Sequence, residues 1–169
     1  LNLSNQLVTD KFWGSAFADD LTFFARDNDE LRKVLGLIRE FRDAAGLVIN
    51  TDKSEIFELG DYEYSADIGI PLVKMAKITG VWFSEDYQLM SDTNWNHVRD
   101  NVFGKLARWK NRQLSLIGKS VIVSSQLLPI IMFTGSVMSM PASMNQELSR
   151  GIYMFVHCTY IPPYSSSCA

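Results

Sequence analysis

The sequence predicts an α+β fold, in which short strands and one helix come first and helices alone follow. Runs rich in aromatic and β-branched residues, bounded by turn residues, occur before about residue 85 and are typical of strands. Beyond residue 92 the apolar residues recur at helical spacing. This order indicates an α+β unit followed by an α unit, with the boundary near residues 85–92.

The composition is that of a folded globular protein. Of the 169 residues, 47% are hydrophobic and 21% are charged, which suits one domain or two small ones. Cys158 and Cys168 lack the spacing of a zinc site or a disulfide framework. Residues 1–12 lack the basic start and apolar block of a signal peptide, so we expect an intracellular location. Because the chain begins at Leu1, we expect it to be a fragment of a longer protein.

The charge is divided unevenly along the chain. Residues 1–92 contain nine basic and seventeen acidic side chains, a net charge of −8, whereas residues 93–169 contain seven and two, a net charge of +5. An acidic half that attracts metal ions, joined to a basic half, suits an enzyme that acts on nucleic acid. The same asymmetry also suits two ordinary subdomains.

Two apolar, strand-like runs flank Asp19 and Asp20, between Trp13 and Ala25. Because only these two residues separate the runs, we expect them to form a tight two-residue turn. Such turns favour Asn-Gly or Asp-Gly, since Gly adopts positive φ most readily, and Asp-Asp suits them poorly. Adjacent carboxylates repel each other unless a cation neutralises them, and Mg²⁺ prefers oxygen ligands of this kind. The pair indicates a metal-holding hairpin, with a solvated acidic turn as the alternative.

A helix is predicted over residues 28–45. Asp27 and Glu30 have the spacing of a capping box, and Gly46 is placed to end the helix in a left-handed conformation. Apolar residues recur between them at helical spacing and form one stripe.

Further short elements follow this helix. Strands are predicted at 47–49, 55–59 and 78–83, with a turn at 50–53 and a loop at 60–72. The second half should contain three helices. They are expected near 93–110, from about 115 through a kink at Pro129, and near 144–156, where Ser143 and Gln146 have capping-box spacing.

Four blocks of the sequence resemble reverse transcriptases of LINE-type, non-LTR retrotransposons. Phe17-Ala-Asp-Asp20 in its apolar frame resembles the metal-binding hairpin of reverse transcriptases, whose motif is Tyr or Phe, any residue, Asp, Asp. The other three blocks are Gly46-Leu-Val-Ile-Asn-Thr-Asp-Lys-Ser-Glu55, Ile78-Thr-Gly-Val81, and Leu106-Ala-Arg-Trp-Lys-Asn-Arg-Gln-Leu-Ser-Leu-Ile-Gly-Lys119. Thr79 departs from the usual Leu. The resemblance covers roughly residues 13–141.

The resemblance implies a partial polymerase palm, made of a β-hairpin, a helix and short antiparallel strands, followed by an all-α thumb. The palm would span 1–91 and the helical thumb 92–142, with a C-terminal helix and an unassigned tail in 143–169. The implied activity is that of an RNA-directed DNA polymerase, with an RNA template, a DNA primer and deoxynucleoside triphosphates as partners. The strand that carries the first catalytic aspartate in the family is absent, so we expect the fragment alone to be inactive.

The resemblance also assigns roles to residues. Asp19 would bind metal with Asp20 as its partner, and together with an upstream aspartate they would hold two Mg²⁺ ions, or Mn²⁺. Lys53 would lie near the triphosphate and protonate the leaving group; the alternative is a loop lysine paired with Asp52 or Glu55. Gly80 and Val81 would support the primer end; the alternative is an ordinary buried strand. The residues implied to contact template–primer phosphates are Lys105, Arg108, Lys110, Arg112 and Lys119, which as a bare run would form a solvated face.

Other interpretations stay open. Trp95 and Trp109, at helical spacing, are expected in the thumb core rather than as platforms for stacked bases. The stretch between Lys119 and Glu147 has no charged residue, so a membrane span near 120–140 is an alternative. Two further alternatives are a catalytically dead nucleic-acid-binding relic and a generic Mg²⁺ hydrolase. We expect no membrane contact, and a location in the cytoplasm and nucleus.

Overall fold

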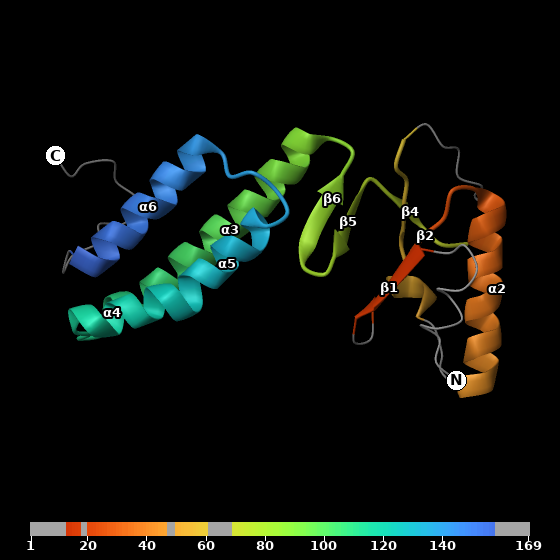
Figure 1. The fold of residues 1–169 in the computed structure, drawn as a ribbon, viewed down its shortest axis with the longest axis horizontal. Coiled ribbons are helices and arrows are strands. Elements are labelled where there is room, and N and C mark those ends of the chain that lie inside the picture. Colours follow the sequence, from red (N-terminus) through yellow and green to blue (C-terminus); the bar gives the residue numbers. More distant parts are fainter. Residues whose placement is uncertain (1–12, 18–19, 47–49, 61–68, 158–169) are drawn as a thin grey trace. The chain divides into compact units, whose positions relative to one another are not determined.

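The computed structural model describes residues 13–17, 20–46, 50–60 and 69–157 (Figure 1). The chain divides into two compact units, residues 1–86, here called the N-terminal unit, and residues 87–169, here called the helical unit. The described part of the first contains strands and one long helix, and that of the second contains helices alone. The α+β fold class predicted from the sequence is therefore confirmed.

The first hairpin pairs β1 (Trp13–Phe17) with β2 (Asp20–Phe24) in antiparallel register, with Phe17 opposite Asp20. Asp20 belongs to β2, so the prediction that it is a turn residue is wrong, and Asp19 lies outside the described residues. Gly14 lies opposite Phe23, and a Cβ atom at Gly14 would lie 2.8 Å from Cδ1 of that ring. Gly14 therefore allows the ring to lie across the neighbouring strand.

Helix α2 (Asn28–Ala45) has the bounds that the sequence predicts, because both ends are set by local caps. The Asp27 carboxylate accepts a 2.7 Å hydrogen bond from the Glu30 N–H, and Gly46 at φ 68° donates to the Arg42 carbonyl. The Glu30 carboxylate accepts from the backbone N–H of Arg26 at 2.9 Å, and from its guanidinium at 2.8 Å. The reciprocal bond of the capping box thus goes to the residue before the N-cap.

The next segment contains a 3₁₀ turn η1 (Thr51–Lys53) and strand β3 (Ile56–Phe57), which is shorter than the predicted strand 55–59. β3 pairs in parallel with β4 (Leu72–Val73), so the expectation that all the short strands are antiparallel is wrong. The sequence did not show this pairing, because β4 lies at the edge of the stretch predicted as a loop, and the turn residues of that loop do not indicate how the flanking segments pair. The predicted strand at 47–49 lies outside the described residues.

A second hairpin replaces the single strand predicted at 78–83. Strands β5 (Met75–Ile78) and β6 (Val81–Ser84) are antiparallel, with Ile78 opposite Val81. The two residues between them have positive φ, 47° at Thr79 and 94° at Gly80. This is the backbone of a tight hairpin turn, in which Thr is unusual because β-branched residues rarely adopt positive φ.

The helical unit contains α3 (Tyr87–Lys110), α4 (Leu116–Ile122), the π-helical segment η3 (Val123–Leu127), α5 (Leu128–Gly135) and α6 (Ala142–His157). The three predicted helices are confirmed, and α4, η3 and α5 together form the second of them. α3 begins at Tyr87, earlier than residue 93. α6 begins at Ala142, so Ser143 lies inside its first turn and the predicted capping box there is wrong.

The π-helical segment ends at Leu127, two residues before Pro129, which lies in the first turn of α5. The N–H of Leu128 donates to the Val123 carbonyl, five residues back. A proline ring clashes with the carbonyl four residues before it in a regular α-helix. The wider turn of η3 relieves this clash without ending the helix, which explains why the kink predicted at Pro129 appears as a π segment.

The helical unit has a well-formed core. Residues at helical spacing on α3 meet α5 and α6, and Figure 1 shows these helices side by side. Trp95 is 1% exposed, and its indole N–H donates to the Ser139 carbonyl at 3.0 Å. A Cβ atom at Gly151 would lie 2.6 Å from the Phe103 ring, so α6 approaches α3 closely at this glycine. Among the described residues of the unit, the buried hydrophobic ones are Trp95, Val98, Val102, Leu106, Ile122, Leu127, Met138, Leu148 and Phe155.

Candidate functional site

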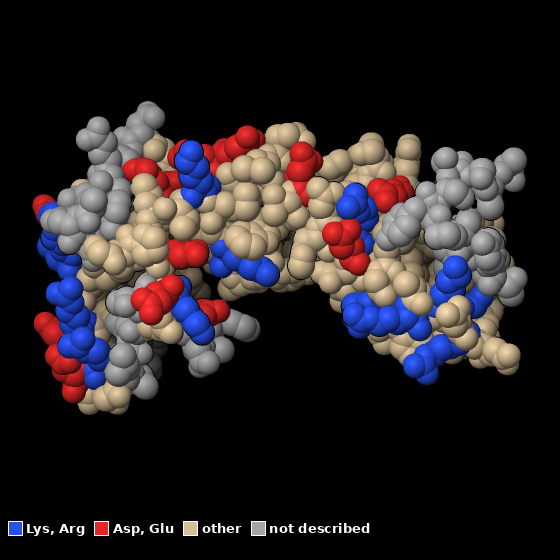
Figure 2. Space-filling view, turned by 180° about the vertical axis from the view of Figure 1, so that it is seen from behind, with Lys and Arg blue, Asp and Glu red and all other residues tan. Residues whose placement is uncertain are grey.

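A basic cleft lies at the C-terminal end of α3. It has a volume of about 210 Å³ and is lined by Lys105, Arg108, Trp109, Arg112 and Gln126. Three of the five basic residues that the family resemblance implied to contact phosphates therefore line one cleft. Figure 2 shows Lys and Arg side chains gathered on one face of the helical unit. We call this feature the basic cleft.

The end of α3 explains why these side chains converge. Lys105, Arg108 and Trp109 lie within the last two turns of the helix, where cations interact favourably with the helix dipole. The chain then turns back on itself, because the Arg112 N–H donates to the Trp109 carbonyl at 3.1 Å. This turn places the Arg112 guanidinium over the Trp109 ring, 5.2 Å from its centroid.

Trp109 is fixed from a second direction by η3. Its indole N–H donates to Oε1 of Gln126 at 3.3 Å. Trp95 is buried as predicted, but Trp109 is only half-buried and forms part of the cleft wall, so the prediction of a core position holds for Trp95 alone. Gln126 was not among the predicted site residues. In the sequence it stands out only as a polar amide within an apolar, uncharged stretch. The direction of its side chain depends on the π-helical turn.

Lys119 is directed away from the basic cleft. Its ammonium donates to the Val156 carbonyl near the end of α6 at 3.4 Å and lies 5.9 Å from the centroid of the Phe155 ring. A cation at this position stabilises the C-terminal end of a helix. The side chain of Lys110, on the last residue of α3, is not among those that line the cleft. These two predicted contacts are therefore not brought together with the other three.

Asp20 is the one member of the predicted metal-binding pair that lies within the described residues. It is exposed at the start of β2, and Asp19 lies outside the described residues. In the part of the chain that the structure describes, no three or more His, Cys, Asp or Glu residues lie close enough together to hold a metal ion. The described carboxylates therefore do not themselves complete the two-metal site that the resemblance implies.

Lys53 is the last residue of η1, and its side chain is exposed. Its backbone N–H donates to both the Asn50 carbonyl and Asn50 Oδ1, each at 3.2 Å, which fixes the turn. Among the described residues, no ion pair joins its ammonium to Asp52 or Glu55. The alternative of a loop lysine paired with these neighbours is therefore not observed.

Gly80 and Val81 lie in the β5–β6 hairpin. Gly80 is the second turn residue and is exposed, whereas Val81 opens β6 and is 2% exposed. The side chain of Val81 is therefore buried, which agrees with the alternative reading of a buried strand residue. The exposed backbone of Gly80 is the part of this pair that a partner can reach.

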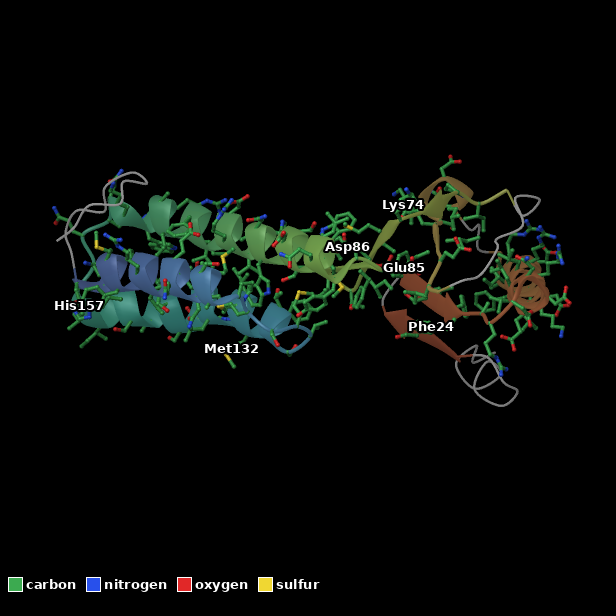
Figure 3. All side chains as sticks on the ribbon, turned by 90° about the horizontal axis from the view of Figure 1, so that it is seen from above. Phe24, Lys74, Glu85, Asp86, Met132 and His157 are labelled. Atoms are coloured by element: carbon green, nitrogen blue, oxygen red, sulfur yellow. The ribbon has the colours of Figure 1, made fainter. Side chains whose placement is uncertain are left out.

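An apolar surface covers the helix formed by α4, η3 and α5. Residues Leu116–Gly135 are long and apolar enough to cross a membrane by length and composition, with a mean hydropathy of 1.7. Its exposed members include Ile117, which is 77% exposed, and Met132, which projects away from α5 in Figure 3. A core helix of a soluble protein passes the same test of composition. The exposure of this surface keeps the membrane-associated alternative open.

No family model matches the chain. The class of protein must therefore be argued from the four sequence blocks and from the geometry of the basic cleft and the first hairpin.

Proposed function

We propose that the chain forms the C-terminal part of the palm and the thumb of an RNA-directed DNA polymerase of the LINE type. The observation that carries the proposal is the basic cleft, where Lys105, Arg108 and Arg112 come together on the unit that corresponds to the thumb. Clustered cations bind phosphates without regard to sequence, as a polymerase requires of the part that holds template and primer. The proposal extends to the full-length protein, of which this chain is one part.

In this proposal the first hairpin serves the chemistry. Asp19 and Asp20, with an aspartate from an upstream strand, would hold two Mg²⁺ ions, and metal bound there would supply activation of the primer 3′-hydroxyl and stabilisation of charge on the transferring phosphoryl group. Lys53, exposed at the end of η1, donates a proton to the departing pyrophosphate. Asp20 is exposed at one end of its strand, where a ligand can reach its carboxylate.

Primer extension tests the proposal directly. The chain is extended upstream through the remaining palm and fingers, and synthesis on an RNA template is compared between the parent protein and Asp19→Asn. We expect Mg²⁺-dependent synthesis to fall about a hundredfold or more in the variant, because a metal ligand contributes several kcal/mol to transition-state stabilisation. Asp43→Asn is the matched control, since Asp43 is exposed on α2 and pairs with Arg42. It should leave the rate unchanged.

The other outcomes select among the alternatives. A folded parent that binds template–primer but never extends it is a catalytically dead relic, and a parent that binds no nucleic acid contradicts the thumb assignment. The 169-residue chain by itself should not extend a primer. Robust Mg²⁺-dependent extension by this chain would overturn that expectation.

A membrane-associated protein is the second candidate, favoured by the exposed apolar surface of Leu116–Gly135. The two candidates differ in the behaviour of the purified chain without detergent. A membrane-spanning helix requires detergent or lipid to stay in solution, whereas a thumb helix does not. Sedimentation of the chain in detergent-free buffer therefore separates them.

A further inference from the structure

The basic cleft combines cations with a surface on which rings can stack. A protein that only contacts the phosphates of a duplex needs positive charge and no aromatic side chain. Here the three cations share the cleft with the Trp109 indole and the Gln126 amide. Cationic grooves that include aromatic side chains are typical of sites for single-stranded nucleic acid, because an unpaired base exposes its face.

The ring system is held in place before any ligand arrives. The Arg112 guanidinium lies over the Trp109 ring at 5.2 Å, and Gln126 holds the indole N–H at 3.3 Å. Arg112 itself is exposed, so the outer side of this cation–π pair is open to solvent. Bases stack on guanidinium planes as well as on aromatic rings, so an unpaired base can extend the Trp109–Arg112 stack.

The size of the basic cleft sets the size of its ligand. Its volume of about 210 Å³ is below the range of roughly 300–1,000 Å³ found for sites that enclose whole small molecules. A cleft of this size suits contact with one nucleotide of a longer strand rather than enclosure of a free ligand, with Lys105 and Arg108 available for the adjoining phosphate. A continuous duplex keeps its bases paired and stacked, so it offers phosphates to this cleft and no base.

We propose that the basic cleft binds an unpaired nucleotide of a single-stranded nucleic-acid segment, through stacking on the Arg112–Trp109 pair and phosphate contacts from Lys105 and Arg108. The inference rests on the proposed function in taking nucleic acid as the ligand. It deepens that function by assigning a single-stranded segment to a place on the helical unit, in addition to the duplex that the thumb would hold.

The test compares two labelled probes, an oligothymidylate of about 12 nucleotides and a hairpin duplex with the same number of phosphates. Their binding to the 169-residue chain is measured by fluorescence anisotropy over a range of salt concentrations. The decisive variant is Arg112→Lys, which keeps the charge and removes the planar guanidinium. We expect it to weaken single-strand binding about three- to tenfold, which corresponds to part of a stacking contact, with duplex binding unchanged.

Two further variants sharpen the comparison. Trp109→Leu removes the ring that supports the stack, and we expect about a tenfold loss of single-strand binding. Arg150→Lys is the matched control, because Arg150 is exposed on α6 and does not line the basic cleft. It makes the same chemical change elsewhere on the unit and should alter neither probe's affinity. Circular dichroism measures whether each variant is folded. If Trp109→Leu does not fold, the result for Arg112→Lys decides whether the basic cleft binds an unpaired nucleotide.

The outcomes separate this inference from the proposed function. If the parent chain binds the duplex and Arg112→Lys does not change single-strand binding, the inference is overturned. It is also overturned if Arg112→Lys weakens the binding of both probes equally. Either result leaves the thumb assignment in place. Failure of the parent chain to bind either probe at low salt overturns both. Binding of the single strand alone, sensitive to Arg112→Lys, supports the inference and contradicts the duplex-holding role.

Discussion

The helical unit and the N-terminal unit bury their apolar residues to different extents. Of the twelve described hydrophobic residues that are buried, nine lie in the helical unit, and the other three are Val34, Ala76 and Val81. Exposed large side chains occur in both units, with Leu59 62% exposed in the N-terminal unit and Ile117 77% exposed in the helical unit, so the difference lies in the buried residues. The described strands of that unit form three separate two-stranded sheets, and such sheets are only marginally stable by themselves.

This difference decides which candidate site has its side chains held in place within this chain. The helical unit carries its own core, so the side chains of the basic cleft are held in place by packing within that unit. In the proposed polymerase the N-terminal unit gains its remaining stability from further palm strands of the full-length protein. Under the proposed function, nucleic-acid binding is therefore to be tested on this chain, and polymerisation on the longer protein.

The largest expected effect concerns the close approach of α6 to α3. Gly151→Ala should destabilise the helical unit by about 1–3 kcal/mol, because the new Cβ overlaps the Phe103 ring in a packed interior. Gly104→Ala is the matched control, since nothing lies within 4 Å of a Cβ atom there. It should stabilise the unit by up to about 1 kcal/mol through helix propensity. Hydrogen exchange followed segment by segment measures both changes.

The same measurement tests whether the two units unfold independently. If the helical unit carries an independent core, Gly151→Ala accelerates exchange in α3 and α6 and leaves the β5–β6 hairpin unaffected. Equal acceleration in residues 75–84 would mean that the two units unfold together, and the distinction drawn above would fail.

A smaller effect is expected at the β5–β6 turn of the N-terminal unit. Thr79→Asn should stabilise the hairpin by about 1 kcal/mol, because Asn adopts positive φ more readily than a β-branched residue, and Asn-Gly is the preferred sequence for this turn. Slower amide exchange in residues 75–84 would be the sign of this gain. Thr79→Val keeps the β-branch and should give none; a gain equal to that of Asn would rule out backbone strain as the cause.

The smallest effect is a pH dependence at the start of α2. A side-chain hydrogen bond from the Arg26 guanidinium, aided by its charge and by its backbone N–H, lowers the pKa of the Glu30 carboxyl below its ordinary value. The bond therefore stabilises the folded state fully above the unfolded pKa of about 4.3. This contribution is lost as the pH falls through the lower, folded pKa.

An NMR titration of the Glu30 side-chain carboxyl measures this shift. Arg26→Gln should return the pKa of Glu30 toward its ordinary value and raise the pH at which the first turn of α2 frays. Arg39→Gln, an exposed charge farther along the same helix, is the control and should leave the titration midpoint in place. An unchanged midpoint in Arg26→Gln would show that the ion pair is absent in solution.

Local signals made parts of the fold predictable. The bounds of α2 follow from Asp27 and Gly46, which act on backbone groups within four residues. The β5–β6 turn was missed because Thr79 at positive φ gives no signal in the sequence. The parallel pairing of β3 with β4 was missed because the turn residues of the loop between them do not indicate how the flanking segments pair.

The candidate site, like the fold, could be predicted from the sequence only in part. The family resemblance singled out the basic residues, whereas the charge run alone would have indicated a solvated face, and three of them line the basic cleft. The direction of Lys119 could not be predicted, because its partner carbonyl at Val156 lies 37 residues away. Gln126 could not be placed either, since an α-helical projection does not account for the wider turn of η3.

The π-helical segment η3 has a consequence for the length of the sequence. A π turn inserts one residue into an α-helix while the regular helix continues on both sides. Deleting one residue of η3 would therefore leave Ile122 and Thr134 on the same buried side, but would restore the clash between the Pro129 ring and the carbonyl four residues earlier. The extra residue and the proline are thus coupled: a chain that loses both can keep the helix, whereas a chain that loses the extra residue alone cannot keep it regular.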